Sequence, residues 1–293
     1  MKYFQKLHPL SAFIYFLIVI LIAMLTMNPI IITICYVSGI CFYGMLVGIR
    51  KLLNSLKYNI PLLLMLALTN PLFVHKGETI LFFLNDNPVT LESILYGTFA
   101  SIMIMSIYYW FCCYSEIMSS DKFIYLFGKV SPKLSLLLSM SLSFIPKLKK
   151  RYKEIYNAQK ALGIFISKSY VDKIRTVFRI LAILLTSSLE NAIETSDSMK
   201  ARGYGLKGRT SYTIYSFNVS DIIFLIFSLF VGIGIILFII LGYSTFNYYP
   251  TISTFDFSPI VIIMYLLIVI KTGISILLEV KENLLWRYLK SKI

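Results

Sequence analysis

Charged residues are scarce in this sequence, and acidic residues are the scarcest of them. Only 14% of the 293 residues are Asp, Glu, Lys or Arg, whereas a soluble domain carries about a quarter. Hydrophobic residues make up 58% of the chain, and the mean hydropathy is +0.78. A water-soluble fold of this length could not bury so much apolar surface. The composition therefore predicts an all-α, polytopic membrane protein.

Histidine and cysteine are also rare, and neither shows the spacing of a metal site. His8 and His75 stand alone, and no CxxC pair occurs. The cysteines all lie inside apolar runs, as small buried hydrophobic residues do: Cys35, Cys41, Cys112 and Cys113. We expect no disulfide framework, no metal site and no cofactor.

Apolar runs long enough to cross a bilayer, which takes about 20 residues, occur about six times. They cover residues 10–27, 30–49, 58–74, 91–113, 221–241 and 258–278, and the third is short. No small-residue cleavage site closes the first run, so it reads as a retained span and not as a signal peptide. The turn at Asn28-Pro29 joins the first two runs into a hairpin.

The basic residues predict which side of the membrane each loop faces. With six spans and both termini in the cytoplasm, 27 of the 28 Lys and Arg residues lie inside and only Lys76 lies outside. The net charge of +14 thus marks the cytoplasmic face of a cell (inner) membrane protein and its attraction to anionic lipid. No stacking-plus-basic motif accompanies the charge, so we expect no nucleic-acid partner.

Residues 114–212 separate the transmembrane regions 1–113 and 213–293, and they are too long for a simple connector. Three helices are predicted here. The first, 132–145, is too short to span the bilayer and stops at Pro146; the others cover 147–162 and 171–202. We assign the segment to cytoplasmic or interfacial helices, and residues 213–293 to two spans and a cytoplasmic tail.

The second and third of these helices end alike, in Ala161-Leu162-Gly163 and Ala201-Arg202-Gly203. Glycine just past a helix end is an ordinary C-cap, because it accepts the left-handed conformation. The flanking residues echo each other as well, with Asn157-Ala158-Gln159-Lys160 matching Asp197-Ser198-Met199-Lys200. Capping alone does not explain that second likeness.

With these motifs the chain resembles the transmembrane T component of energy-coupling factor (ECF) transporters, the ABC-type vitamin and metal-ion importers of prokaryotes. The likeness spans about residues 5–290. It is densest in Phe144-Ile145-Pro146, Ala158-Gln159-Lys160-Ala161, Ser198-Met199-Lys200-Ala201-Arg202-Gly203-Tyr204-Gly205 and Gly208-Arg209-Thr210. The resemblance implies a non-catalytic subunit with two crossed coupling helices. Each would dock on one of two cytoplasmic ATPases, and together they would move a substrate-binding membrane subunit (S component).

The same resemblance implies the docking residues. Arg202 would donate to a carboxylate or to free helix carbonyls of one ATPase, with Ala201 and Gly203 shaping the helix end. At the other end, formed by Ala161 and Gly163, the family usually has arginine where this chain has Leu162. Either that contact is apolar, or Lys160 supplies its charge.

Two other functions stay open as alternatives. An ion-coupled secondary transporter usually holds an ionisable residue at mid-membrane depth, and here only Lys271 lies deep, where we expect it to snorkel toward the inner interface. A membrane-embedded enzyme would need convergent acids or histidines, and the candidates share one helix: Glu190, Glu194 and Asp197. The sequence Gly203-Tyr-Gly-Leu-Lys-Gly-Arg-Thr is not a Walker A motif, so we expect no ATPase activity in this chain.

Overall fold

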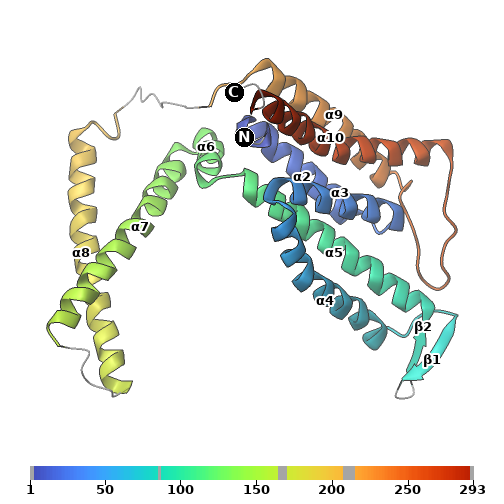
Figure 1. The fold of residues 1–293 in the computed structure, drawn as a ribbon, viewed down its shortest axis with the longest axis horizontal. Helices are drawn as coiled ribbons and strands as arrows, with labels where there is room; N and C mark the ends of the chain where they lie inside the picture. The colour runs from blue at the N-terminus through green and yellow to red at the C-terminus, as the bar shows by residue number, and fades with distance from the viewer. Residues whose placement is uncertain (1–2, 85–86, 164–169, 207–214, 291–293) are drawn as a thin grey trace. The chain divides into compact units, whose positions relative to one another are not determined.

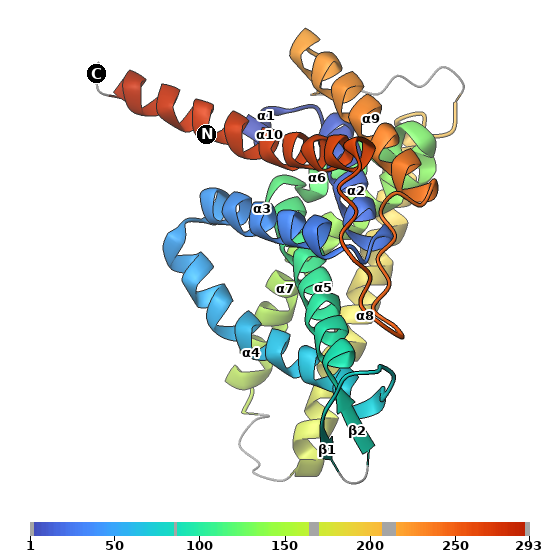
Figure 2. The same cartoon turned by 90° about the vertical axis from the view of Figure 1, so that its right-hand side faces the viewer.

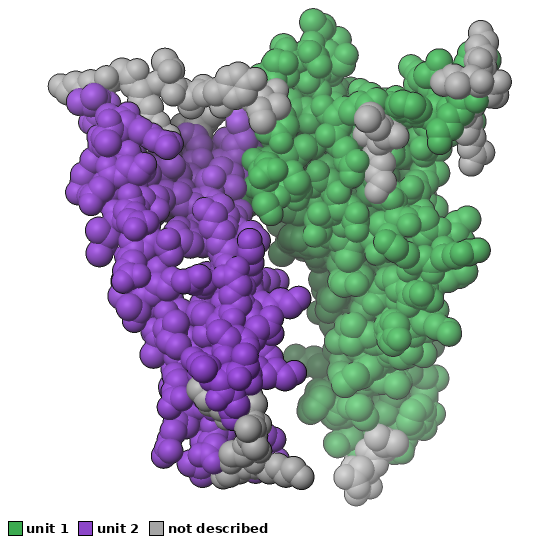
Figure 3. Space-filling view, turned by 60° about the vertical axis from the view of Figure 1, so that its left-hand side comes forward, with its two compact units in different colours: residues 1–123, 215–293 green, residues 124–214 purple. Residues whose placement is uncertain are grey.

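The structure is a computed structural model, which describes residues 3–84, 87–163, 170–206 and 215–290. It divides into two compact units, coloured separately in Figure 3. Unit 1 comprises residues 1–123 and 215–293, and unit 2 comprises residues 124–214. The described residues are helical apart from one short hairpin (Figure 1). The prediction of an all-α membrane protein is confirmed.

Unit 1 contains seven helices and the hairpin among its described residues. These are α1 (Tyr3–Lys6), α2 (Pro9–Leu25), α3 (Pro29–Val47), α4 (Ile49–Phe73), α5 (Leu91–Ile117), α9 (Val219–Ile240) and α10 (Pro259–Lys290), with β1 (Ile80–Leu84) and β2 (Asn87–Thr90). Helix α5 packs on α3 and α4, α2 packs on α9, and α10 packs on α3. Figure 2 shows α4 and α5 converging on the hairpin, which α4 and α5 contact through β2.

The local sequence explains where these helices begin. The Asn28 side chain accepts a hydrogen bond from the Ile30 N–H (3.0 Å), and Pro29 occupies the first helical position of α3. The predicted Asn28-Pro29 turn is thereby confirmed. At α9, the Asp221 carboxylate in the first turn accepts from the Asn218 N–H (3.1 Å). A carboxylate there also opposes the positive end of the helix dipole.

Among the described residues, six helices are long and apolar enough to cross a membrane. They are Pro29–Val47, Ile49–Phe73, Leu91–Ile117, Tyr170–Ala201, Val219–Ile240 and Pro259–Lys290. The number agrees with the prediction, but the membership does not. Helix α2 has 17 residues and falls just short, whereas α8 (Tyr170–Ala201), the predicted coupling helix, qualifies. Length and composition alone therefore do not decide which helices cross the bilayer.

Prolines interrupt fewer helices than the sequence suggested. The short third span becomes the 25-residue α4, which contains Pro61 and Pro71. The predicted stop at Pro146 is wrong, because α7 (Pro132–Ala161) runs through it for 30 residues. One proline removes a single backbone hydrogen bond and costs about 3 kcal/mol, a loss that the other turns of a long helix can outweigh.

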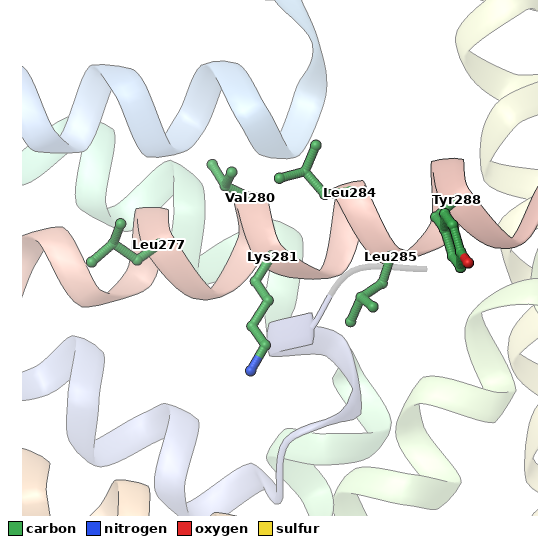
Figure 4. A pocket seen from close by; sticks show the side chains of 6 residues that line it. All are labelled: Leu277, Val280, Lys281, Leu284, Leu285 and Tyr288. Atoms are coloured by element: carbon green, nitrogen blue, oxygen red, sulfur yellow. The ribbon is translucent and has the colours of Figure 1, made fainter.

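Helix α10 also exceeds its predicted span, continuing twelve residues past position 278 into the predicted cytoplasmic tail. Its last turns bear a shallow groove of about 450 Å³ (Figure 4). Apolar side chains from Leu277 to Tyr288 line the groove, together with Lys281. Next to it, the Lys6 ammonium in α1 contacts the Glu282 carboxylate at 2.5 Å, so α1 is tied to this extension.

The core of unit 1 is built around aromatic rings. Phe4, Tyr15, Phe16, Phe42 and Trp110 are fully buried, and the ring centroids of Phe4 and Phe42 lie 5.3 Å apart. The Trp110 indole N–H donates to the Cys35 carbonyl oxygen at 3.0 Å. Edge-to-face ring contacts add about 0.5–1.5 kcal/mol per pair beyond apolar burial.

Lys271 does not snorkel, contrary to the prediction. Its side chain is fully buried, and its Nζ donates to the Ser228 carbonyl oxygen at 2.8 Å and to the Ser228 hydroxyl. The ammonium lies 4.9 Å from the centroid of the Tyr15 ring. These neutral oxygens and the ring face satisfy the charge locally, so it need not reach the interface.

Candidate docking site at two helix ends

Unit 2 consists chiefly of two long helices that cross. Helix α7 packs on α8, the two run in opposite directions, and both appear in Figure 1. The buried side chains of unit 2 mark the crossing: Ile155 on α7, and Thr176 and Ile180 on α8. Helix α6 (Ser120–Val130) is held to α7 by a hydrogen bond from the Ser135 hydroxyl to the Ile124 carbonyl (3.3 Å).

The end of α8 forms a complete Schellman cap around Gly203. Gly203 has φ +80°, a left-handed conformation that glycine adopts without steric cost. The Gly203 N–H donates to the Lys200 carbonyl (2.9 Å), and the Tyr204 N–H donates to the Met199 carbonyl (3.0 Å). These two bonds are the defining pair of the motif. They fix the chain direction at the helix end and thereby position Arg202.

The end of α7 repeats the described part of this cap. Gly163 has φ +75°, and its N–H donates to the Lys160 carbonyl at 3.0 Å. Leu162 takes the place that Arg202 holds on α8, and 72% of it is exposed. The predicted glycine C-caps are thus confirmed at both ends. An exposed leucine at such a point is suited to an apolar contact.

The side chains at the two ends point to solvent. Arg202 is exposed, and within the described residues its guanidinium makes no ion pair or side-chain hydrogen bond. Lys160 is exposed likewise, whereas the Lys200 ammonium lies 3.4 Å from the Asp197 carboxylate one turn earlier. No described residue thus accepts from the five guanidinium donors of Arg202.

The two glycine ends lie at opposite ends of the helix pair. Because α7 and α8 run antiparallel, their C-termini point in opposite directions from the crossing (Figure 1). A 32-residue helix such as α8 is about 48 Å long. A single globular partner therefore does not reach both ends easily, while two separate partners can each bind one.

The alternative metal site gains no geometric support. Among the described residues, no three His, Cys, Asp or Glu side chains gather as a metal site would require. Glu190, Glu194 and Asp197 follow one face of α8, and Asp197 pairs with Lys200. The Gly208-Arg209-Thr210 segment lies outside the described residues. Sequence reasoning missed Tyr204, whose N–H closes the cap, although a residue at that position is part of every Schellman motif.

Comparison with known proteins gives a consistent result. The family profile described as cobalt transport protein (CbiQ) matches residues 3–212. Several relatives are named energy-coupling factor transporter transmembrane protein EcfT. The Streptococcus thermophilus protein is 39% identical over 108 residues, which are 36% of this chain and 40% of that protein. The Lactococcus lactis protein is 44% identical over 82 residues, or 27% and 31%, and the Bacillus subtilis protein is 38% identical over 82 residues, again 27% and 31%. The aligned part thus spans about two fifths of these relatives or less.

Proposed function

Since the chain belongs to the CbiQ family and is a T component of the energy-coupling factor type, we propose that it transmits motion from two cytoplasmic ATPases to a substrate-binding membrane subunit. The observation that carries the proposal is the pair of exposed, glycine-capped helix ends at opposite ends of crossed helices. The chain itself is non-catalytic, and nucleotide is hydrolysed by its partners.

The end of α8 is the polar contact of the pair. Arg202 places its guanidinium just before a left-handed glycine, where no Cβ obstructs a partner backbone. A charge-assisted hydrogen bond from arginine to a carboxylate or to free helix carbonyls is worth about 1.5–3 kcal/mol. Ala201 and Gly203 have little or no side chain, so a groove on the partner can enclose Arg202 without a steric clash.

The end of α7 is the apolar contact. Leu162 presents an exposed branched side chain beside Gly163, and Ala161 adds little bulk. Lys160 flanks this end and can approach a partner carboxylate, but it lacks the planar fork that allows bidentate pairing. The two ATPases would therefore be held by contacts of different chemistry.

The third partner is a small substrate-binding membrane subunit. Helix α8 leaves large apolar side chains exposed, among them Phe178, Leu185 and Leu189. Such surface is covered in a membrane complex by lipid or by another protein. The substrate is a vitamin or a metal ion, and it is bound by that subunit and not by this chain.

The orientation follows from the charge distribution. Both termini and the coupling helices lie on the cytoplasmic side of the cell membrane, where the ATPases have access to nucleotide. The basic residues of unit 2, including Lys147, Lys150 and Arg202, then face anionic lipid and cytoplasmic partners. The opposite orientation would place almost all of the positive charge outside.

The decisive experiment measures how many ATPase subunits remain bound. The tagged chain is co-expressed with its two ATPases and a substrate-binding subunit. The complex is extracted in detergent, and its mass is measured. Arg202→Glu is expected to remove one ATPase while leaving membrane insertion intact. Arg50→Glu, at an exposed arginine of unit 1, is the control and should retain both. Full ATPase stoichiometry together with full transport by Arg202→Glu would contradict the proposal.

The α7 end is tested separately. Leu162→Asp should weaken the other ATPase contact, since it places a charge in an apolar groove, whereas Leu162→Met should preserve it. If instead Lys160→Gln removes that ATPase and Leu162→Asp does not, the contact is electrostatic and the apolar assignment of Leu162 is wrong.

A further inference from the structure

The two long helices of unit 2 diverge on one side of their crossing and enclose a groove. The groove has a volume of about 450 Å³ and lies between α7 residues 144–154 and α8 residues 187–195. On α7, the buried Ile155 directly follows the last residue of the groove lining. On the other wall, the lining follows α8 through residues 187–195, in the direction of Arg202. The arrangement resembles a pair of levers with one packed pivot.

Opposite charges line the two walls of this groove. The α7 residues lie at i, i+3, i+4 and i+7, the spacing that places side chains on one helix face. The α8 carboxylates lie at i and i+4 on the facing wall. The charged lining residues are Lys147, Lys150, Arg151 and Glu154 on α7, and Glu190 and Glu194 on α8. Three cations on one wall thus oppose two carboxylates on the other.

In this structure the opposing charges do not touch. The Arg151 guanidinium contacts Glu154 on its own helix at 3.3 Å, and the Lys147 ammonium lies 5.7 Å from the Phe144 ring centroid. Among the described residues that line the groove, no ion pair within 4.0 Å joins α7 to α8. The cations of α7 and the carboxylates of α8 therefore attract each other across the groove without direct contact.

We propose that this groove is an electrostatic latch that sets the angle between α7 and α8. Closing the groove would bring Lys147 and Lys150 against Glu190 and Glu194 and would shift the Arg202 end, eight residues or about 12 Å beyond Glu194. These four side chains are positioning residues for the docking end. The inference rests on the proposed function, because only a docked end turns a change of angle into transport.

The latch has a physical basis in the spacing of the charges. Unopposed, the cations of α7 would repel one another, and the facing carboxylates relieve that repulsion more strongly as the gap narrows. Each partly exposed pair contributes little alone. Two pairs acting on one lever add up, so the open and closed positions can differ by a population ratio of about three- to tenfold. Such a modest bias can be reversed by a partner subunit.

Charge exchange across the groove is the test. Glu190→Lys combined with Glu194→Lys should reduce transport about three- to tenfold without releasing either ATPase. Adding Lys147→Glu and Lys150→Glu should restore transport, because the opposite charges face each other again. The neutral pair Glu190→Gln and Glu194→Gln, which changes shape least, should show a smaller loss and guards against misfolding of the reversed variant.

The distance between α7 and α8 tests the latch independently of transport. Spin labels at Lys149→Cys and Ala192→Cys, two exposed positions outside the groove, are placed in a background without the four native cysteines. The label distance should lengthen in the Glu190→Lys, Glu194→Lys chain and in 1 M salt, where the screening length falls to about 3 Å. It should shorten again in the exchanged variant.

Two results would overturn the latch: an unchanged distance and transport in the reversed variant, or no recovery on charge exchange. Failure of the proposed function has a different signature, because Arg202→Glu would then keep both ATPases whatever the groove variants do.

Discussion

The two units differ in where they place their apolar side chains. Unit 1 buries its largest ones, with Trp110, Tyr15 and Phe42 fully enclosed. In the described part of unit 2 the buried side chains are Ile155, Ile180 and Thr176 alone, although α8 carries apolar residues along most of its length. Unit 1 therefore has an extended buried core, whereas the described part of unit 2 has only a small one. A lever that must move gains from having one small pivot in place of a wide core.

The largest expected effect comes from opening the aromatic core of unit 1. Trp110→Ala removes a fully buried ring and its hydrogen bond to the Cys35 carbonyl, and should cost about 3–5 kcal/mol of unfolding free energy. Ile180→Ala, at the pivot of unit 2, should cost about 2 kcal/mol and leave unit 1 folded. Denaturant titration in detergent micelles, followed by limited proteolysis of each unit, separates the two effects. Equal losses of stability in the two units would contradict the difference between their cores.

A close helix contact inside unit 1 provides the next test. A Cβ on Gly232 of α9 would lie 2.5 Å from the Cγ2 of Ile18 on α2, a branched atom with little freedom. Gly232→Ala should therefore force α2 and α9 apart and cost about 1–3 kcal/mol.

Gly234→Ala on the same helix is the matched control. A Cβ there meets nothing within 4 Å, so the substitution should be neutral or stabilise the helix by about 0.5–1 kcal/mol. The thermal unfolding of the two variants is compared under one set of conditions. A similar change in stability for both would show that the contact with α2 does not control position 232.

Sequence reasoning found the helices and their caps but not their continuity. Apolar runs, Asn28-Pro29 and the two terminal glycines were read correctly because each acts through its nearest neighbours. Pro146 was read as a stop, yet α7 passes through it. Whether a proline ends a helix depends on the contacts of the turns on either side, and these are not visible in a local pattern.

The candidate site was predictable only in part, for a similar reason. The ends at Gly163 and Gly203 carry a local signal, and their φ values agree with it. That Lys150 faces Glu190 across a groove depends on how α7 and α8 cross, since 40 residues separate the two. The acidic stripe on α8 was recognised, but its facing wall could come only from the tertiary arrangement. Lys271 shows the same limit, because Ser228 and Tyr15 reach it from other helices.

A smaller effect is expected at the docking end of unit 2. Gly203→Ala places a Cβ in a left-handed conformation, which costs roughly 1–2 kcal/mol, and brings it to 3.1 Å from the Leu206 Cδ1. The last turn of α8 should fray, and one ATPase should bind less tightly. Asn tolerates this conformation better, so Gly203→Asn should recover part of the loss. Hydrogen exchange of the amides before residue 203 measures the fraying directly. Protection unchanged in Gly203→Ala would mean that the partner, and not the cap, orders this end.

The smallest effects are expected from exposed ion pairs, and here the two units should behave alike. Lys6 and Glu282 pair in unit 1 with 50% and 15% of their side chains exposed, while Lys200 and Asp197 pair in unit 2 with 72% and 67% exposed. Water screens both pairs, so Lys6→Gln should cost no more than about 1 kcal/mol and Lys200→Gln about half of that or less. Unfolding midpoints at low and high salt test this, because the cost should shrink as salt rises. A loss of several kcal/mol from Lys6→Gln would mean that α1 holds the end of α10 in place, and that unit 1 depends on its edge as much as on its aromatic core.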